Sequence, residues 1–354
     1  LTSWVVILSI ATFTLSMSGT FLVRSGILNS VHTFANDPER GLFILIFLFC
    51  LIFLLLFIFF FFFKTDKNNN NLFWLSKETA ILVNNWFMVY FLVVVLVGTI
   101  YPIFLEVFSS EKISIGPPFY NKLIIPFLIP FLLAMTIGPK LKWIKSDLRN
   151  KGYLILFFII SLLLSIMIII NLSINFLVNT VLVTSAFYLF FITSRDFFVK
   201  GFNKLSQNIA HFGFSLLILS ILFNNIFSTE IISNLKIGET FEGKNFKIKF
   251  ENIKQKEEYN YKSIKGKFKI ENLDGSFEVL YPELRIYNQP NIVTSEADIK
   301  TNFLTDKFMT MNYVQNQDYF NVRYQVKPFM IWIWLSVILI SLGGFVSFFK
   351  RYEN

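Results

Sequence analysis

Long apolar runs separated by short polar loops make up most of the chain. Crossing the hydrocarbon core of a bilayer takes roughly 20 residues in a helix, and eight runs approach or exceed that length. They cover residues 2–23, 41–63, 80–105, 121–138, 152–171, 175–193, 208–227 and 329–349. The pattern predicts a polytopic α-helical membrane protein with about eight transmembrane helices.

One segment does not follow this pattern. Residues 228–328 contain fifteen basic and fourteen acidic residues, and apolar and polar positions alternate there with the period of a β-strand. Alternation is clearest in the runs from Phe246 to Phe250 and from Phe320 to Val326, and Asp274–Gly275 is a typical hairpin turn. We expect a small antiparallel β domain inserted between the last two spans.

These two patterns divide the chain into three parts. Residues 1–227 are predicted to be a membrane domain with seven spans, and residues 228–328 the extramembrane β domain. Residues 329–354 are predicted to be the last span and a short tail.

Composition and charge fit a membrane protein and indicate its orientation. Hydrophobic residues are 54% of the chain and charged residues only 16%, too few to cover a water-facing surface. The short loops on the side that holds the loop after the first span carry four Lys or Arg, and the opposite loops carry thirteen. By the positive-inside rule, the first of these sides, together with the β domain, faces the periplasm or intermembrane space. The net charge of +9 is therefore a topology signal and no sign of nucleic-acid binding.

The single cysteine, Cys50, excludes an internal disulfide and a CxxC redox pair. It lies in the second predicted span, where we expect it to be an ordinary core residue. No catalytic triad, phosphate loop or carboxylate pair is present in the spans.

The chain has two histidines, and His211 lies inside the seventh predicted span, in SQNIAHFGFSLLILS. Ionisable residues at that depth are rare and usually functional. Neutral imidazole is a common ligand of haem iron, and Gly213 permits close approach of a flat group or of another helix. The alternative is a histidine hydrogen-bonded to a neighbouring helix. One spanning histidine supplies only one axial ligand, so a bis-histidine haem would need its second from a partner.

His32 lies in the loop after the first span, in RSGILNSVHTFANDPERG. Asp37 and Pro38 predict the start of the second helix, with Asp37 as N-cap. Arg24 and Arg40 flank the loop, where they could contact an anionic cofactor edge or anchor to lipid head groups. The alternative for His32 is a loop histidine that hydrogen-bonds to backbone.

Five motifs in order along the chain carry a family resemblance. They are SGTFLVRSGILNSVHTFANDPERGLFIL, GTIYPIF with KISIGPPFYN, NIAHFGF, YPELRIYNQPNIVTSEADI and RYQVKPFMIWIWL. Together they resemble the C-terminal half of the CcmF family, the haem lyase subunit of cytochrome c maturation system I. The resemblance covers nearly the whole chain. The GPPFYN segment at residues 116–121 either orders the surface near a haem or caps the fourth span.

The resemblance implies a role for each candidate residue. His32 matches a histidine that ligates the incoming haem, His211 matches an axial ligand of a resident b-type haem, and Arg24 is a candidate propionate contact. The implied reaction joins the haem vinyl groups to the two thiols of an apocytochrome c CxxCH motif. The protein then holds and orients the cofactor, which explains why no acid, base or nucleophile is expected among its residues.

The resemblance also implies partners, because the family's tryptophan-rich WWD segment and two further histidines have no counterpart here. We expect a second, N-terminal CcmF-like chain that carries the WWD segment and shares the b haem, and we expect no activity without it. A haem chaperone, apocytochrome c with its delivery proteins, and membrane lipid are the other expected partners. Leu1 in place of methionine, and the Phe and Asn bias, favour a split mitochondrial form in the inner membrane over a bacterial inner-membrane protein. The competing hypothesis is a structural or transport subunit of an inner-membrane complex, with no haem.

Overall fold

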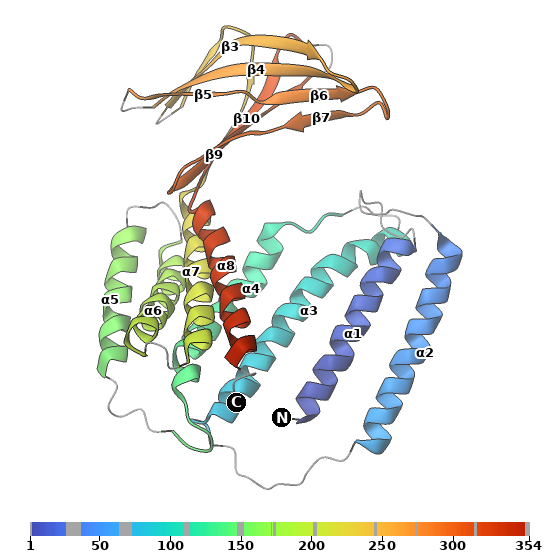
Figure 1. Cartoon of the computed structure of the whole chain (residues 1–354), viewed down its shortest axis with the longest axis vertical. Helices are drawn as coiled ribbons and strands as arrows, with labels where there is room; N and C mark the ends of the chain where they lie inside the picture. The colour runs from blue at the N-terminus through green and yellow to red at the C-terminus, as the bar shows by residue number, and fades with distance from the viewer. Residues whose placement is uncertain are drawn as a thin grey trace. The chain divides into compact units, whose positions relative to one another are not determined.

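The computed structural model describes residues 2–25, 37–63, 73–109, 113–146, 152–170, 172, 175–200, 204–243, 246–272, 275–314 and 317–350. The chain forms two compact units, Leu1–Leu156 and Phe157–Asn354, and each is considered by itself. Within the described residues, eight helices are long and apolar enough to cross a membrane (Figure 1), which confirms the predicted fold class.

The first unit contains four of these helices. They are α1 (Thr2–Arg24), α2 (Pro38–Phe62), α3 (Lys77–Ser109) and α4 (Pro117–Ile137), and the short 3₁₀ turn η1 (Gly138–Lys140) follows α4. The rings of Trp4 and Trp86 meet edge to face at 5.5 Å and join α1 to α3. Helices α3 and α4 are held together by Tyr90, whose hydroxyl donates to the Leu123 carbonyl at 3.0 Å.

The start of α2 follows the prediction. Asp37 is the N-cap, its side chain accepts a hydrogen bond from the Arg40 N–H at 3.2 Å, and Pro38 occupies the first turn. Cys50, on this helix, is exposed, so the expectation that it is a core residue is wrong. The reason is that α2 turns large apolar side chains outward along its length, as a lipid-facing helix does.

The second unit contains helices α5 (Gly152–Ile169), whose first turn lies in the other unit, α6 (Phe176–Lys200), α7 (Leu205–Phe227) and α8 (Met330–Lys350). Of the apolar helices that the structure describes, α6 is the most buried. Figure 1 shows α7 and α8 side by side, with the strands continuing from their upper ends. Small residues let these two helices approach closely: a Cβ placed on Gly343 would lie 2.7 Å from the backbone nitrogen of Ala210.

Several helices extend beyond the predicted apolar runs, and α6 and α7 do so where the sixth span is joined to the seventh. The sixth span was predicted to end at residue 193, but α6 continues to Lys200, and the seventh begins at Leu205 instead of residue 208. No proline or glycine interrupts residues 194–200, so the charged residues there extend the helix by almost two turns.

The described residues of the β domain form ten strands in two sheets. They are β1 (Thr229–Leu235), β2 (Thr240–Glu242), β3 (Phe246–Glu257), β4 (Tyr261–Asn272), β5 (Phe277–Leu280), β6 (Glu283–Tyr287), β7 (Val293–Glu296), β8 (Asp298–Thr301), β9 (Thr305–Tyr313) and β10 (Phe320–Pro328). One sheet has the order β1-β10-β9-β8 and the other β2-β3-β4-β6-β7, with β5 paired to β4. All recorded pairings are antiparallel, as predicted.

The two sheets enclose an apolar core that uses the alternating positions. Ile248 and Phe250 of β3 point inward, and Phe250 stacks on Phe268 of β4 at 4.2 Å between ring centroids. Val322 and Tyr324 of β10 close the core from the other sheet. The predicted hairpin turn joins β4 to β5, where Gly275 has a positive φ of 78°; Asp274 lies outside the described residues.

Candidate functional site

His32 lies in residues 26–36, outside the described part of the chain, so its predicted role stays a prediction. The described ends of this loop meet: the Asp37 N–H donates to the Arg24 carbonyl at 3.3 Å. Arg24 is the last residue of α1, and its side chain is exposed. Arg40 forms an ion pair with the Asp37 carboxylate at 3.1 Å, so its guanidinium group is engaged at the start of α2.

His211 lies within α7 and is half-buried. Since α7 begins at Leu205, the imidazole is about 9 Å along the helix axis from the first residue. His211 also interacts with other residues of the protein, so it is not a free side chain.

Gly213 allows α8 to pack closely against α7. A Cβ at this position would lie 3.0 Å from the backbone nitrogen of Ile340 on α8. Two residues along a helix correspond to a rotation of roughly 200°, so His211 projects away from the side of α7 that touches α8. The imidazole therefore does not lie in the α7–α8 seam.

On its other side, α7 packs against α6 with polar and aromatic pairs. The hydroxyls of Thr193 and Ser215 are 2.6 Å apart, and the rings of Phe197 and Phe212 stack at 5.4 Å. Each pair joins the two antiparallel helices at one level. Ser215 follows His211 by one helical turn, so the imidazole lies at the edge of the α6–α7 seam.

At the same level α6 carries a buried carboxylate that the sequence pattern did not single out. Asp196 is buried, and it precedes Phe197 by one residue just as His211 precedes Phe212. Because the two phenylalanines are level with each other, Asp196 and His211 lie within about two residues, roughly 3 Å, of one another along the helix axes. Arg195 pairs with Asp196 at 3.4 Å. The signal was missed because the span was predicted to end at residue 193, which placed this charged pair in a loop.

On these helices His211 could be one ligand of a haem iron, but the described side chains do not form a larger metal site. Among the described residues, no group of three His, Cys, Asp or Glu side chains is placed to hold a metal ion. A half-buried imidazole on an apolar helix fits the ligand chemistry of haem iron, which takes one or two such groups. A carboxylate near such a ligand can orient its ring.

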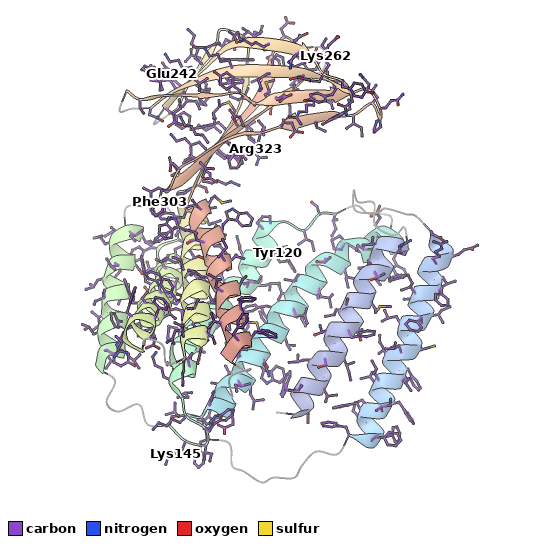
Figure 2. The ribbon with its side chains drawn as sticks, viewed as in Figure 1. Tyr120, Lys145, Glu242, Lys262, Phe303 and Arg323 are labelled. Carbon is purple, nitrogen blue, oxygen red and sulfur yellow. The ribbon has the colours of Figure 1, made fainter. Side chains whose placement is uncertain are left out.

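The GPPFYN segment caps α4. Gly116 is the N-cap in extended conformation, and Pro117 is the first helical residue, where a missing N–H costs nothing. Figure 2 marks Tyr120, which lies in the first turn; its ring packs where a Cβ on Gly98 would be. Of the two expectations for this segment, the structure supports the capping role.

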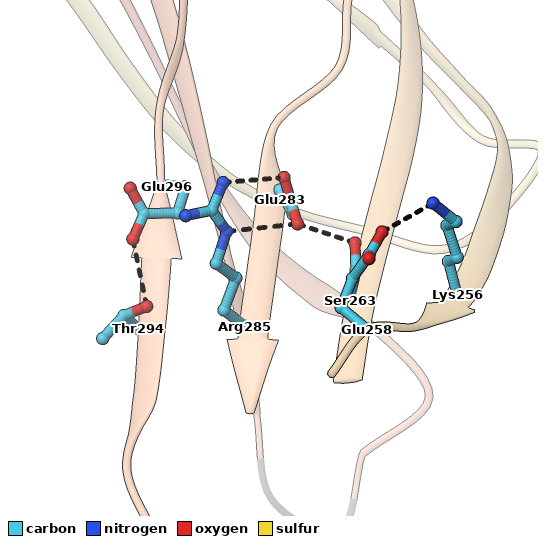
Figure 3. Close-up of polar contacts among 7 residues, drawn as sticks. All are labelled: Lys256, Glu258, Ser263, Glu283, Arg285, Thr294 and Glu296. Carbon is cyan, nitrogen blue, oxygen red and sulfur yellow. Dashed lines mark hydrogen bonds and ion pairs between the residues drawn. The ribbon is translucent and has the colours of Figure 1, made fainter. Parts of the chain in front are cut away.

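The β domain carries a polar cluster on β4, β6 and β7, drawn in Figure 3. Glu283 accepts hydrogen bonds from Ser263 at 2.7 Å and Arg285 at 3.2 Å. Burial raises the pKa of Glu283, but these hydrogen bonds outweigh it and hold the pKa below the usual value. Each acid here has a partner on the same or the next strand, so the cluster stabilises the sheet and offers no open ligand position.

Comparison with known proteins gives a consistent result over the whole chain. Residues 226–328 match the family model described as the CcmF C-terminal beta-sandwich. The chain is 32% identical over 99% of its length to the cytochrome c-type biogenesis protein CcmF of Pseudomonas fluorescens, and 31% identical over 99% of its length to that of Escherichia coli. It spans about half the length of these relatives, 55% and 56% respectively.

A solved structure shares the fold. The chain superposes on the structure titled Cytochrome c Heme Lyase CcmF with a TM-score of 0.68 and 21% identity, covering 94% of this chain and 53% of that one. The described helices, the inserted β-sandwich and the similar sequences all point to the same kind of protein. Residues 226–328 match the CcmF C-terminal beta-sandwich, and along nearly its whole length the chain is similar to the C-terminal half of the cytochrome c-type biogenesis protein CcmF.

Proposed function

We propose that the chain is part of a haem lyase that attaches haem covalently to apocytochrome c. The observation that carries the proposal is the half-buried His211 on α7, beside the α6–α7 seam, in a chain related along its length to CcmF proteins. The chain spans only about half of those relatives, so the lyase is complete only together with a chain or segment that supplies the rest.

In this proposal His211 would be one ligand of a resident b-type haem, and a histidine outside this chain would be the other. Haem of this type, when bound, supplies one-electron redox chemistry. The residues of this chain hold and orient it: α6 and α8 fix the position of α7, and the Asp196 carboxylate near the seam limits the rotation of the imidazole. Since His211 is about 9 Å from the start of α7, a haem held by it would lie nearer to that end of the helix.

His32 ligates the incoming haem, which is a substrate, and Arg24 contacts one of its propionates. Each vinyl group of that haem gains a thioether bond to a cysteine of the CxxCH motif, and the thiol proton ends on the former vinyl group. No acid, base or nucleophile of this chain takes part. By charge distribution, His32 and the β domain face the periplasm or intermembrane space.

The partners are those that the chemistry requires. They are an N-terminal CcmF-like chain with the WWD segment, a haem chaperone that delivers haem, and apocytochrome c with the proteins that present its reduced thiols. The membrane is the mitochondrial inner membrane, or the inner membrane of a bacterium.

A reduced-minus-oxidised absorption spectrum of the purified complex tests this function directly. The proposal expects low-spin b-type bands, and covalent haem on coexpressed cytochrome c after denaturing electrophoresis. A structural or transport subunit would give neither signal, and that outcome would refute the proposal.

A further inference from the structure

The turn between β8 and β9 carries two exposed apolar side chains next to the beginning of a membrane span. Phe303 is 60% exposed and Leu304 is 56% exposed. Both lie in the second unit, and Figure 2 marks Phe303 between the β-sandwich and the upper end of α8. Although Phe303 touches one ring of α8, the described part of the unit leaves more than half of each side chain uncovered.

The turn is rigid and fixed by its own hydrogen bonds. The Asn302 side-chain oxygen accepts bonds from the N–H groups of Leu304 at 3.0 Å and Thr305 at 2.8 Å. The Asn302 N–H donates back to the Thr305 carbonyl at 3.0 Å. An asparagine that satisfies the backbone in this way sets the conformation of a turn in advance. Phe303 and Leu304 are therefore presented in a defined position.

Three further contacts attach the turn to the first turn of α8. The Phe329 N–H donates to the Leu304 carbonyl at 2.7 Å, and the Trp332 ring N–H donates to the Phe303 carbonyl at 3.1 Å. The rings of Phe303 and Trp332 meet edge to face at 4.8 Å. Since the apolar span begins at Met330, the turn lies at the level where α8 enters the membrane.

The chemistry around the turn matches the head-group region. Tryptophan is enriched at membrane–water interfaces, and Trp332 and Trp334 lie in the first turn and a half of α8. Lys300, at the base of the turn, is exposed but pairs with Glu278 at 4.0 Å, so the attraction of the turn to lipid depends on its apolar and aromatic side chains. Exposed Phe and Leu side chains at this level avoid water by entering the boundary between head groups and acyl chains.

We propose that the β8–β9 turn is a membrane-surface anchor, with Phe303 and Leu304 inserted into lipid. Together with α7 and α8 it gives the β-sandwich a third attachment to the bilayer and limits its tilt. The occupant is lipid because the turn continues the lipid-facing surface of α8 at the level of the interface. This inference depends on the membrane fold alone and not on the proposed haem ligands.

Spin labels placed at single cysteines test the anchor in the full chain, coexpressed with its partners and reconstituted in phosphatidylcholine–phosphatidylglycerol nanodiscs. Cys50→Ser provides the background, since Cys50 is the single cysteine of the sequence. A nitroxide at Leu304→Cys is compared with one at Tyr259→Cys, which is 103% exposed in the β3–β4 turn, and with one at Ile338→Cys, 55% exposed within α8. Power-saturation measurements give the collision rates with oxygen, which concentrates in lipid, and with a water-soluble nickel chelate.

The anchor predicts several-fold less nickel collision at position 304 than at 259, and oxygen collision approaching that at 338. Nickel collision equal to that at 259 would mean that the turn lies in water, and would overturn the proposal. Low collision with both reagents would mean that a protein covers the turn, and would overturn it too. Phe303→Cys, measured in the same way, replaces Leu304→Cys if that variant fails to fold.

Discussion

Gly343→Ala should loosen the packing of α8 on the helix that carries His211. A Cβ on Gly343 would lie 2.7 Å from the backbone nitrogen of Ala210 and 2.8 Å from its Cβ, whereas ordinary contact begins at 3.4 Å. The helices would have to separate by about 0.7 Å, because a backbone atom cannot rotate away. Overpacking of this kind costs about 1–3 kcal/mol. Ala210 immediately precedes His211, so the displacement passes directly to the imidazole.

Gly344→Ala is the matched control, since a Cβ there meets nothing within 4 Å. That variant should be neutral, or more stable by up to about 1 kcal/mol, because alanine favours the helix more than glycine does. Thermal unfolding of the purified complex in detergent, read together with the absorbance of b-type haem, distinguishes the two variants. If Gly343→Ala unfolded at the same temperature as Gly344→Ala and kept full haem content, the close α7–α8 packing described above would be wrong.

Three further predictions concern single residues. His32→Ala should abolish mature cytochrome c while b-type absorbance is retained, because the loop is distinct from α7; normal cytochrome levels would remove His32 from the mechanism. Asp196→Asn should raise the midpoint potential of the proposed b-type haem, since a negative charge at the level of His211 is removed, and redox titration measures this. An unchanged potential would contradict a role for the carboxylate beside His211. The pKa of Glu283 is lowered in the fold, so its contribution to stability is present above its ordinary pKa of 4.5 and lost as the pH falls through the folded value. Protection factors of the β4 and β6 amides, which are corrected for the pH dependence of intrinsic exchange, should therefore fall on acidification, and Glu283→Gln should weaken that dependence.

The sequence predicts the membrane helices and the β domain because both depend on simple periodicities. Length and apolarity identify a span, and alternation identifies strands such as β3 and β10. Helix ends are less predictable: the charged residues from Arg195 to Lys200 read as a loop, yet they continue α6. Hydropathy cannot separate a loop from a helix that extends beyond the bilayer.

The candidate site is predictable only in part, because packing decides which side of a helix a residue occupies. His211 stands out in the sequence as an ionisable residue in an apolar run. The role of Gly213 does not, since only the position of α8 shows that this glycine admits a helix. Asp196 becomes relevant only once the pairing of Phe197 with Phe212 fixes the register of α6 on α7. The predicted burial of Cys50 was wrong because an apolar run looks the same in a helix at the core of the protein and in one at its periphery.

The central claim is that His211 ligates a haem iron that it shares with a histidine of another chain. The most direct measurement is the low-temperature reduced-minus-oxidised spectrum of the His211→Gly complex, recorded with and without added imidazole. We expect loss of the b-type bands in the variant and their return with imidazole, which fills the vacated ligand position, while the wild-type chain expressed without its partner shows no six-coordinate haem. Undiminished b-type bands in His211→Gly without imidazole, or a six-coordinate haem in the isolated chain, would contradict the claim.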